Sequence, residues 1–321
     1  MLRWLLPFVL IAASGAALAQ GTADRADRIT AAFEAWLASV KTDGVIALRY
    51  EGAPVSVTGF GMDADAPVEL ASVGKSITAA CVFTLVRDDL LNYQDRFDAI
   101  VGRGPNVTIA HLLVQTSGLR KDSTQKDMRG WLGDPPHRAA DVLDRVIARD
   151  APDRGPGRYA YNNENYALLG LVVEAVSGAS YEETCRTRAL TPAGVDAMPS
   201  PLSGAYLPWG GWAMTADDYA KWHAYWYGPD GPLGRSPLDH PHAEVVEGVW
   251  HGMGSYVRVG NGRANHWYFG ALCMPGRVNV GSYAVNWSGG WSLFAAFEAC
   301  LDWDDMARLD QELARAAFSK D

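Results

Sequence analysis

A serine and a lysine three residues apart open the most chemically informative segment of this 321-residue sequence. Ser72 and Lys75 stand in the run ASVGKS at residues 71–76, which leads into an apolar stretch. If Ser72 opens a helix, Lys75 lies almost one turn further along the same face, and its amine reaches the serine hydroxyl. Because the following helix is apolar on nearly every side, we expect it to be buried and to perturb the protonation of Lys75.

The helix start would also supply backbone N–H groups that stabilise an oxyanion formed when Ser72 attacks a carbonyl. The spacing alone does not decide, because an ordinary N-capping serine gives the same pattern. A phosphate-binding loop is excluded, since Glu69 stands where its first glycine is required, five positions before Gly74.

A second segment, GPGRYAYNN at residues 155–163, runs into another apolar helix. Here Tyr161 and Asn163 form a Tyr-x-Asn pair on a loop that enters the helix. A phenol in that place can relay a proton and an amide can orient a carbonyl. A turn rich in tyrosine and asparagine is the simpler alternative for this segment in isolation.

Composition restricts the class of protein that carries these residues. Hydrophobic residues make up 48% of the chain and charged residues 20%, which is typical of a folded globular protein. The 28 basic and 37 acidic residues give a net charge of −9, which leaves no electrostatic footprint for nucleic acid.

The first 19 residues have the layout of a cleavable secretory signal. Arg3 precedes an apolar run from Trp4 to Ala13, and small residues at 17–19 end the segment. We therefore expect a mature chain of residues 20–321 without a stable membrane span, secreted or located in a bacterial periplasm. An uncleaved membrane anchor is the alternative.

Helical patterns and strand patterns occupy different parts of the mature chain. Residues 25–40 predict an amphipathic helix, followed by a β-hairpin around Glu51–Ala53. Residues 72–227 are dominated by helical patterns, and short strands follow Trp250 before a helix over 304–318.

This order predicts an α+β fold in a single domain. We expect one antiparallel sheet built from the N- and C-terminal segments, flanked by helices, with a mostly helical lobe inserted. The α/β lobe would cover about residues 20–70 and 228–321, and the helical lobe about 71–227.

The four cysteines, Cys81, Cys185, Cys273 and Cys300, have no CxxC spacing, which disfavours a zinc ribbon or a thioredoxin-type centre. Cys273 and Cys300 lie in segments that both resemble strands, so they could meet across a sheet, but free buried thiols fit equally well. The run from Asp239 to Glu244, with His251 nearby, has metal-ligand types but fits a polar surface loop better. We expect no metal and no cofactor.

In combination, the segments resemble the serine β-lactamase and penicillin-binding-protein superfamily, in the branch of class C β-lactamases, DD-peptidases and related esterases. The matching segments keep the family order over most of the mature chain: ASVGKSITA at 71–79, TIAHLLVQTSGL at 108–119, PGRYAYNNENYALLGLVVEAVSG at 156–178 and GGWAMTADDYAKW at 210–222. The resemblance implies a β-lactamase/transpeptidase-like fold and an acyl-enzyme mechanism in a cleft between the two lobes.

By this resemblance Ser72 is the acylated nucleophile, Lys75 accepts its proton, and Tyr161 is a second general base. Asn163 would hold the substrate, and the backbone N–H of Ser72 would form half of the oxyanion hole. Among the many tryptophans, Trp267 and one or two of the Trp209–Trp212 group are expected to wall an apolar cleft.

The family's third element, Lys-Thr-Gly or His-Thr-Gly on a strand, matches only in part. Tyr268-Phe269-Gly270 keeps the glycine, and Ala271 would complete the oxyanion hole, but a phenol replaces the cation or imidazole. His266 would face the same side of the strand as Tyr268 and recover some of that role.

The resulting hypothesis is an exported serine hydrolase that acts on small ester or amide substrates through Ser72. One alternative is a β-lactamase or DD-peptidase that acts on β-lactams or cell-wall peptides. Another is a catalytically weak binding protein for cell-wall peptides.

Overall fold

The protein is represented by a computed structural model that describes residues 7–149 and 155–319. Residues 1–6 of the predicted signal peptide lie outside the described residues. Cleavage of the signal peptide, residues 1–19, stays a prediction. In the two described ranges, no helix has both the length and the apolar character needed to cross a membrane.

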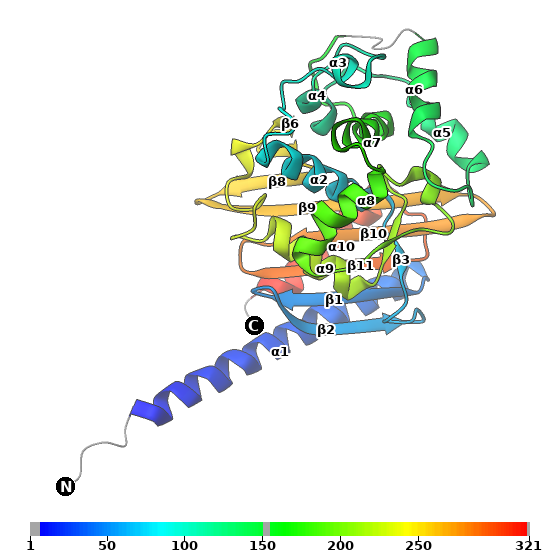
Figure 1. Ribbon diagram of the computed structural model, residues 1–321. Helices are drawn as coiled ribbons and strands as arrows, with labels where there is room; N and C mark the ends of the chain where they lie inside the picture. The colour runs from blue at the N-terminus through cyan, green and yellow to red at the C-terminus, as the bar shows by residue number, and fades with distance from the viewer. Residues whose placement is uncertain (1–6, 150–154, 320–321) are drawn as a thin grey trace.

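An eight-stranded antiparallel sheet forms the frame of the molecule and is built from both ends of the chain (Figure 1). β1 (Gly44–Tyr50) and β2 (Ala53–Phe60) form the hairpin predicted around Glu51–Ala53. The C-terminal strands are β6 (His242–Val246), β7 (Val249–Gly252), β8 (Ser255–Gly260), β9 (Arg263–Met274), β10 (Val278–Asn286) and β11 (Trp291–Phe297). The spatial order is β2-β1-β11-β10-β9-β8-β7-β6. Since β1 pairs directly with β11, the two chain ends share one sheet, and the predicted fold class is confirmed.

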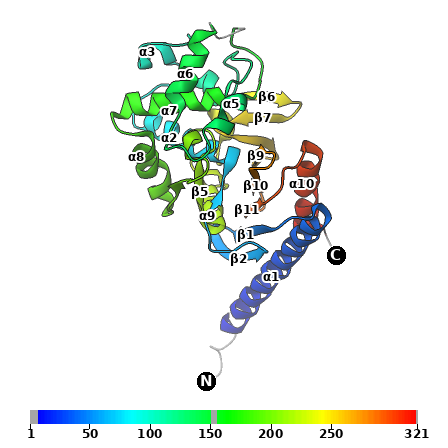
Figure 2. The ribbon, with the colours of Figure 1, turned by 90° about the vertical axis from the view of Figure 1, so that its right-hand side faces the viewer.

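Both faces of the sheet are covered, as Figure 2 shows. Along β1, Val45 and Ala47 pack in the core shared with the helical lobe, whereas Ile46 and Leu48 pack in a second core. This alternation follows from the period of two in a strand. The second core lies under α1 (Pro7–Val40) and α10 (Trp303–Phe318), which pack against each other.

The inserted lobe is mostly helical, as predicted. Its regular elements are η1 (Ala71–Gly74), α2 (Lys75–Arg87), α3 (Phe97–Val101), α4 (Ile109–Leu113), α5 (Thr124–Asp127), η2 (Met128–Gly130), α6 (Ala139–Ala148), α7 (Asn163–Ser177), α8 (Tyr181–Cys185), η3 (Arg186–Leu190), η4 (Thr191–Ala193) and η5 (Gly204–Tyr206). A small sheet in the order β3-β5-β4 accompanies them, with β3 at Val68–Glu69, β4 at Met198–Pro199 and β5 at Trp212–Met214.

The last helix of the expected helical lobe, α9 (Ala216–Tyr227), lies against the sheet. The ring of Tyr219 contacts that of Phe294 on β11, with centroids 4.5 Å apart. The sequence pattern placed the end of the helical lobe at about residue 227. In the structure α9 already belongs to the α/β lobe, so the helical lobe ends before residue 216.

The four cysteines form two disulfides, Cys81–Cys185 and Cys273–Cys300. The first joins α2 to α8, and the second joins β9 to the segment that precedes α10. Cys300 lies beyond the end of β11, so the expectation that it sits on a strand was wrong.

The run from Asp239 to Glu244 is not a surface loop throughout. After the short helix η6 (Pro237–Asp239), residues from His242 onward form the edge strand β6, and His251 on β7 is fully buried. The described residues contain no group of three or more ligand-type side chains that could hold a metal ion.

Candidate active site

The nucleophile candidate lies on a 3₁₀ turn that continues into α2. Ser72 is the second residue of η1, and Lys75 is the first residue of α2. A 3₁₀ turn has about three residues per turn, so side chains three apart are almost superposed. The Lys75 Nζ atom consequently lies 3.1 Å from Ser72 Oγ and donates a hydrogen bond to it.

Lys75 is fully buried, as the apolar sequence of α2 predicts. Its amine also donates to the backbone oxygen of Trp209 at 2.7 Å and lies 5.0 Å from the ring centre of Tyr161. Burial lowers the pKa of Lys75 to about 7, and the charge of Asp122 partly opposes that shift. Near neutral pH a substantial fraction of this amine is therefore unprotonated and able to accept a proton.

Tyr161 completes the contacts of the serine hydroxyl. Its hydroxyl lies 2.8 Å from Ser72 Oγ and donates to Asn163 Oδ1 at 3.0 Å. Desolvation raises the pKa of Tyr161, although the residue as a whole is 40% exposed at the cleft. Tyr161 is therefore a neutral phenol that can relay a proton, whereas Lys75 is the group whose pKa suits a base.

Asn163 positions Tyr161 through an amide whose two ends are both bonded within the protein. Its Oδ1 accepts from Tyr161, its Nδ2 donates to Thr124 Oγ1 at 3.1 Å, and its backbone N–H donates to Asp122 Oδ2 at 3.1 Å. The residue is only 5% exposed. Asn163 therefore positions Tyr161. It also lines the cleft, so the substrate contact that the resemblance implies stays a prediction.

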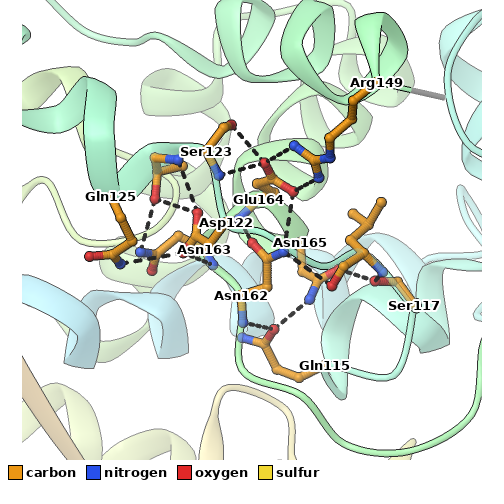
Figure 3. A network of polar contacts seen from close by, with 12 residues as sticks. Gln115, Ser117, Asp122, Ser123, Gln125, Arg149, Asn162, Asn163, Glu164 and Asn165 are labelled. Carbon is orange, nitrogen blue, oxygen red and sulfur yellow. Dashed lines mark hydrogen bonds and ion pairs between the residues drawn. The ribbon is translucent and has the colours of Figure 1, made fainter. Parts of the chain in front are cut away.

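A buried polar network fixes the start of α7, and with it the Tyr-x-Asn pair (Figure 3). Asn162 caps the helix by accepting from the N–H of Glu164 at 2.8 Å. The fully buried carboxylate of Glu164 pairs with Arg149 and accepts two hydrogen bonds from Ser123. These contacts join three separate stretches of the chain behind the loop that carries Tyr161.

Replacing Glu164 by glutamine is expected to lower the free energy of unfolding by about 3 kcal/mol, because the Arg149 charge then loses its buried partner. Urea unfolding measures this loss. The matched control is Asp144→Asn, which removes the exposed ion pair with Arg103 and should cost less than about 1 kcal/mol. A Glu164→Gln variant no less stable than the control would contradict this role for the network.

Gly270 explains how β9 approaches the nucleophile so closely. A Cβ atom at this position would lie 2.2 Å from Ser282 Oγ, 2.8 Å from the backbone oxygen of Leu70 and 3.0 Å from the backbone nitrogen of Ser72. Only glycine avoids these contacts. The glycine that matches the third motif of the family is thus required because the backbone around Ser72 passes so close to β9.

Two other residues of the third-motif segment also reach the cleft. Tyr268 and Ala271 both line the cleft, but the Tyr268 ring is 3% exposed and stacks on Tyr256, with centroids 5.0 Å apart. Burial keeps the pKa of Tyr268 well above its usual value, so it contributes no charge.

His266 does not recover the missing imidazole. It is 2% exposed, packs against the ring of Tyr227, and is not part of the cleft wall. Burial lowers the pKa of His266 to about 3, which leaves the ring neutral. The expectation that His266 replaces the imidazole was wrong. The side of the strand that His266 shares with Tyr268 is covered at this position by Tyr227 of α9, so the His266 ring lies in the core.

A cleft of about 630 Å³ opens beside Ser72. Its lining residues include Tyr161 and Asn163 from the helical lobe and Tyr268 to Met274 from β9. Arg129 is the one charged side chain among them, and it stands on the helical lobe rather than on β9. Trp209 lines the cleft as expected, whereas Trp267 does not.

The sequence interpretation missed one wall of this cleft. Leu301, just before α10, and Trp303 and Met306, in its first turn, also line it. They are distant in sequence from every matching segment. The ring contact of Trp303 with Phe269 and the Cys273–Cys300 disulfide hold this part of the chain beside β9.

Solved structures with the same fold have low sequence identity to this chain. A D-amino acid amidase from Ochrobactrum anthropi SV3 superposes with a TM-score of 0.74 at 16% identity, covering 91% of this chain and 97% of the amidase. A penicillin-binding protein from Bacillus halodurans gives a TM-score of 0.68 at 22% identity, covering 88% of this chain and 98% of that protein. These likenesses confirm the fold.

Sequence relatives match a shorter stretch. Penicillin-binding protein 4* of Bacillus subtilis (strain 168) is 33% identical over 140 residues, which are 40% of this chain and 29% of the relative. Protein flp of Staphylococcus aureus (strain MW2) is 32% identical over 133 residues, or 39% of this chain and 26% of the relative. The family model named Beta-lactamase matches residues 29–299. The resemblance drawn from the four segments is thereby confirmed, and the chain belongs to the Beta-lactamase family.

Proposed function

We propose that this protein is a serine hydrolase that forms an acyl-enzyme through Ser72 and acts on small esters or amides. The observation that carries the proposal is the buried Lys75 amine, which has a pKa of about 7 and lies 3.1 Å from the Ser72 hydroxyl. A serine hydroxyl is a weak nucleophile by itself, and an adjacent base of this kind activates it.

In the acylation step, Ser72 Oγ bonds to the carbonyl carbon of the substrate and its proton passes to the neutral amine of Lys75. The carbonyl oxygen takes up the electron pair and becomes an oxyanion beside the backbone N–H of Ser72 and strand β9. The Ala271 N–H is our candidate for the second donor.

Collapse of this intermediate breaks the bond to the leaving oxygen or nitrogen. The leaving atom takes a proton that Lys75 supplies through the hydroxyl of Tyr161, which contacts Ser72 Oγ. Water then attacks the acyl carbon, and the same groups return a proton to Ser72 as the carboxylic acid is released.

The cleft wall on β9 favours substrates without a carboxylate at the third-motif position. Tyr268 and Phe269 stand where a cation or imidazole and a hydroxyl would bind an anion, and His266 is neutral in the core. Loss of a charge-assisted hydrogen bond of about 1.5–3 kcal/mol weakens binding roughly ten- to a hundredfold. The names of two fold relatives, a D-amino acid amidase and a D-stereospecific amidohydrolase, support amides as a further substrate class.

The test is to compare kcat/KM for p-nitrophenyl acetate or butyrate with kcat/KM for a cephalosporin on one preparation. We expect measurable hydrolysis of the ester and poor hydrolysis of the cephalosporin. Preference for the cephalosporin would contradict the ester assignment and favour a β-lactamase. No turnover of either, with no covalent adduct, would contradict the hydrolase and favour a peptide-binding protein.

We also propose that the chain is exported. The signal-like layout of residues 1–19 supports export, and so does the pairing of all four cysteines into disulfides, which persist in oxidising compartments.

A further inference from the structure

The cleft extends beyond the nucleophile along a free edge of β9. Pairing of β9 with β8 ends at Trp267, opposite Tyr256, whereas pairing with β10 continues to Met274. From Tyr268 onward, one edge of β9 therefore has no partner strand, and the residues of that stretch line the cleft. Successive side chains of a strand point to opposite faces of the sheet. A cleft along the free edge of β9 can therefore be lined by side chains from both faces.

The outer wall at this edge is an exposed indole. Trp303 is 61% exposed, whereas the tryptophans in the two cores are at most 5% exposed. Its ring meets the cleft-lining ring of Phe269 edge-on, with centroids 5.7 Å apart. Leu301 and Met306 flank it on the same wall. A large apolar ring left open in a cleft, next to other apolar side chains, offers a surface for an apolar ligand group.

Two constraints hold this wall in place. The Cys273–Cys300 disulfide joins β9 to the residue before Leu301. Asp302 caps α10 by accepting from the N–H of Asp305 at 2.9 Å, and the buried Leu309 and Leu313 anchor the helix in the second core. The indole is thus presented by a fixed frame, which lowers the entropy cost of binding against it.

We propose that Trp303, with Leu301 and Met306, forms a subsite for an aromatic or branched apolar group of the substrate. The Cys273–Cys300 disulfide positions that subsite. This inference rests on the proposed attack by Ser72 on esters or amides. A cleft of about 630 Å³ has room for a phenyl-sized group beside the reacting carbonyl, more than an acetyl ester fills.

The test is selectivity, measured by pH-stat titration of the acid released from three neutral esters. Methyl phenylacetate carries the ring on the acyl side, benzyl acetate carries it on the alcohol side, and methyl acetate carries none. In the wild type we expect kcat/KM to be higher for at least one aromatic ester than for methyl acetate. Trp303→Ala should lower that selectivity ratio at least fivefold, on the order of tenfold.

The ester whose ratio falls identifies the side of the substrate that meets Trp303. Phe318→Ala is the matched control, because Phe318 is also an exposed aromatic residue of α10, 46% exposed, but lies at the other end of the helix and outside the cleft wall. Its ratios should match those of the wild type. A fall of less than fivefold in both Trp303→Ala ratios would overturn the subsite.

A double variant, Cys273→Ser with Cys300→Ser, tests the positioning role. We expect its aromatic selectivity to fall in the same direction as in Trp303→Ala, and unchanged selectivity would overturn that role. Absence of turnover with all three esters in the wild type would instead count against the proposed hydrolase.

Discussion

Replacing Ser72 by alanine is expected to lower kcat/KM for an activated ester by on the order of 10³-fold or more, because the variant lacks the hydroxyl that is proposed to form the acyl-enzyme. The loss should occur without unfolding, since Ser72 lies at the cleft and its hydroxyl supports no core contact beyond Lys75 and Tyr161 among the described residues. Initial rates with p-nitrophenyl acetate measure it.

Ser76→Ala is the matched control for that variant. Ser76 lies in the same motif, but its hydroxyl donates to the Val73 backbone oxygen and contacts Tyr219, away from the reacting atoms. Its activity should stay within a few fold of the wild type. If Ser72→Ala kept more than about a tenth of the activity, the nucleophile would be another residue.

Replacing Lys75 by methionine is expected to lower kcat/KM by on the order of 10²- to 10⁴-fold, the usual contribution of a general base. Methionine keeps an unbranched apolar chain in the buried position but cannot accept a proton. In the wild type, kcat/KM should fall as the pH drops below about 7, because the ammonium form of Lys75 cannot take the serine proton. Above that value the rate should level off.

The same lowered pKa has a consequence for stability. Between about 7 and the usual lysine value of 10.5, the unfolded chain binds a proton that the folded chain does not. Stability from this group therefore rises with pH across that window. The rise should be absent in Lys75→Met, so the wild-type free energy of unfolding minus that of the variant should increase with pH across this window when both are measured by urea unfolding. A pH–rate profile without an inflection near neutral pH, or a Lys75→Met variant as active as the wild type, would contradict the assignment of Lys75 as base.

Local sequence patterns were sufficient to predict the contact between Ser72 and Lys75, the candidate catalytic pair. The contact between Ser72 and Lys75 depends only on their spacing along one turn, and burial of the lysine follows from the apolar residues of α2 after it. The sheet built from both chain ends could also be predicted, since its hairpin and C-terminal strands carry recognisable turn and strand patterns.

Side chains whose position depends on packing between distant elements could not be predicted in the same way. The role of His266 was misjudged because a strand pattern gives the face of a residue but not what covers that face, which here is Tyr227 from α9. Trp303 was missed because its place at the cleft depends on its contact with Phe269 on β9, a strand distant in sequence from α10. Asn163 was recognised, but its bonds to Asp122 and Thr124 come from a loop some forty residues earlier.

Mapping of a covalent adduct tests whether Ser72 is the residue that becomes acylated. The wild-type protein and Ser72→Ala would each be treated with a fluorophosphonate probe, digested, and analysed by mass spectrometry. We expect one adduct per wild-type chain, on the peptide that contains Ser72, and none in the variant. An adduct on a different residue, or ester hydrolysis by a wild-type protein that acquires no adduct at Ser72, would show that Ser72 is not the nucleophile.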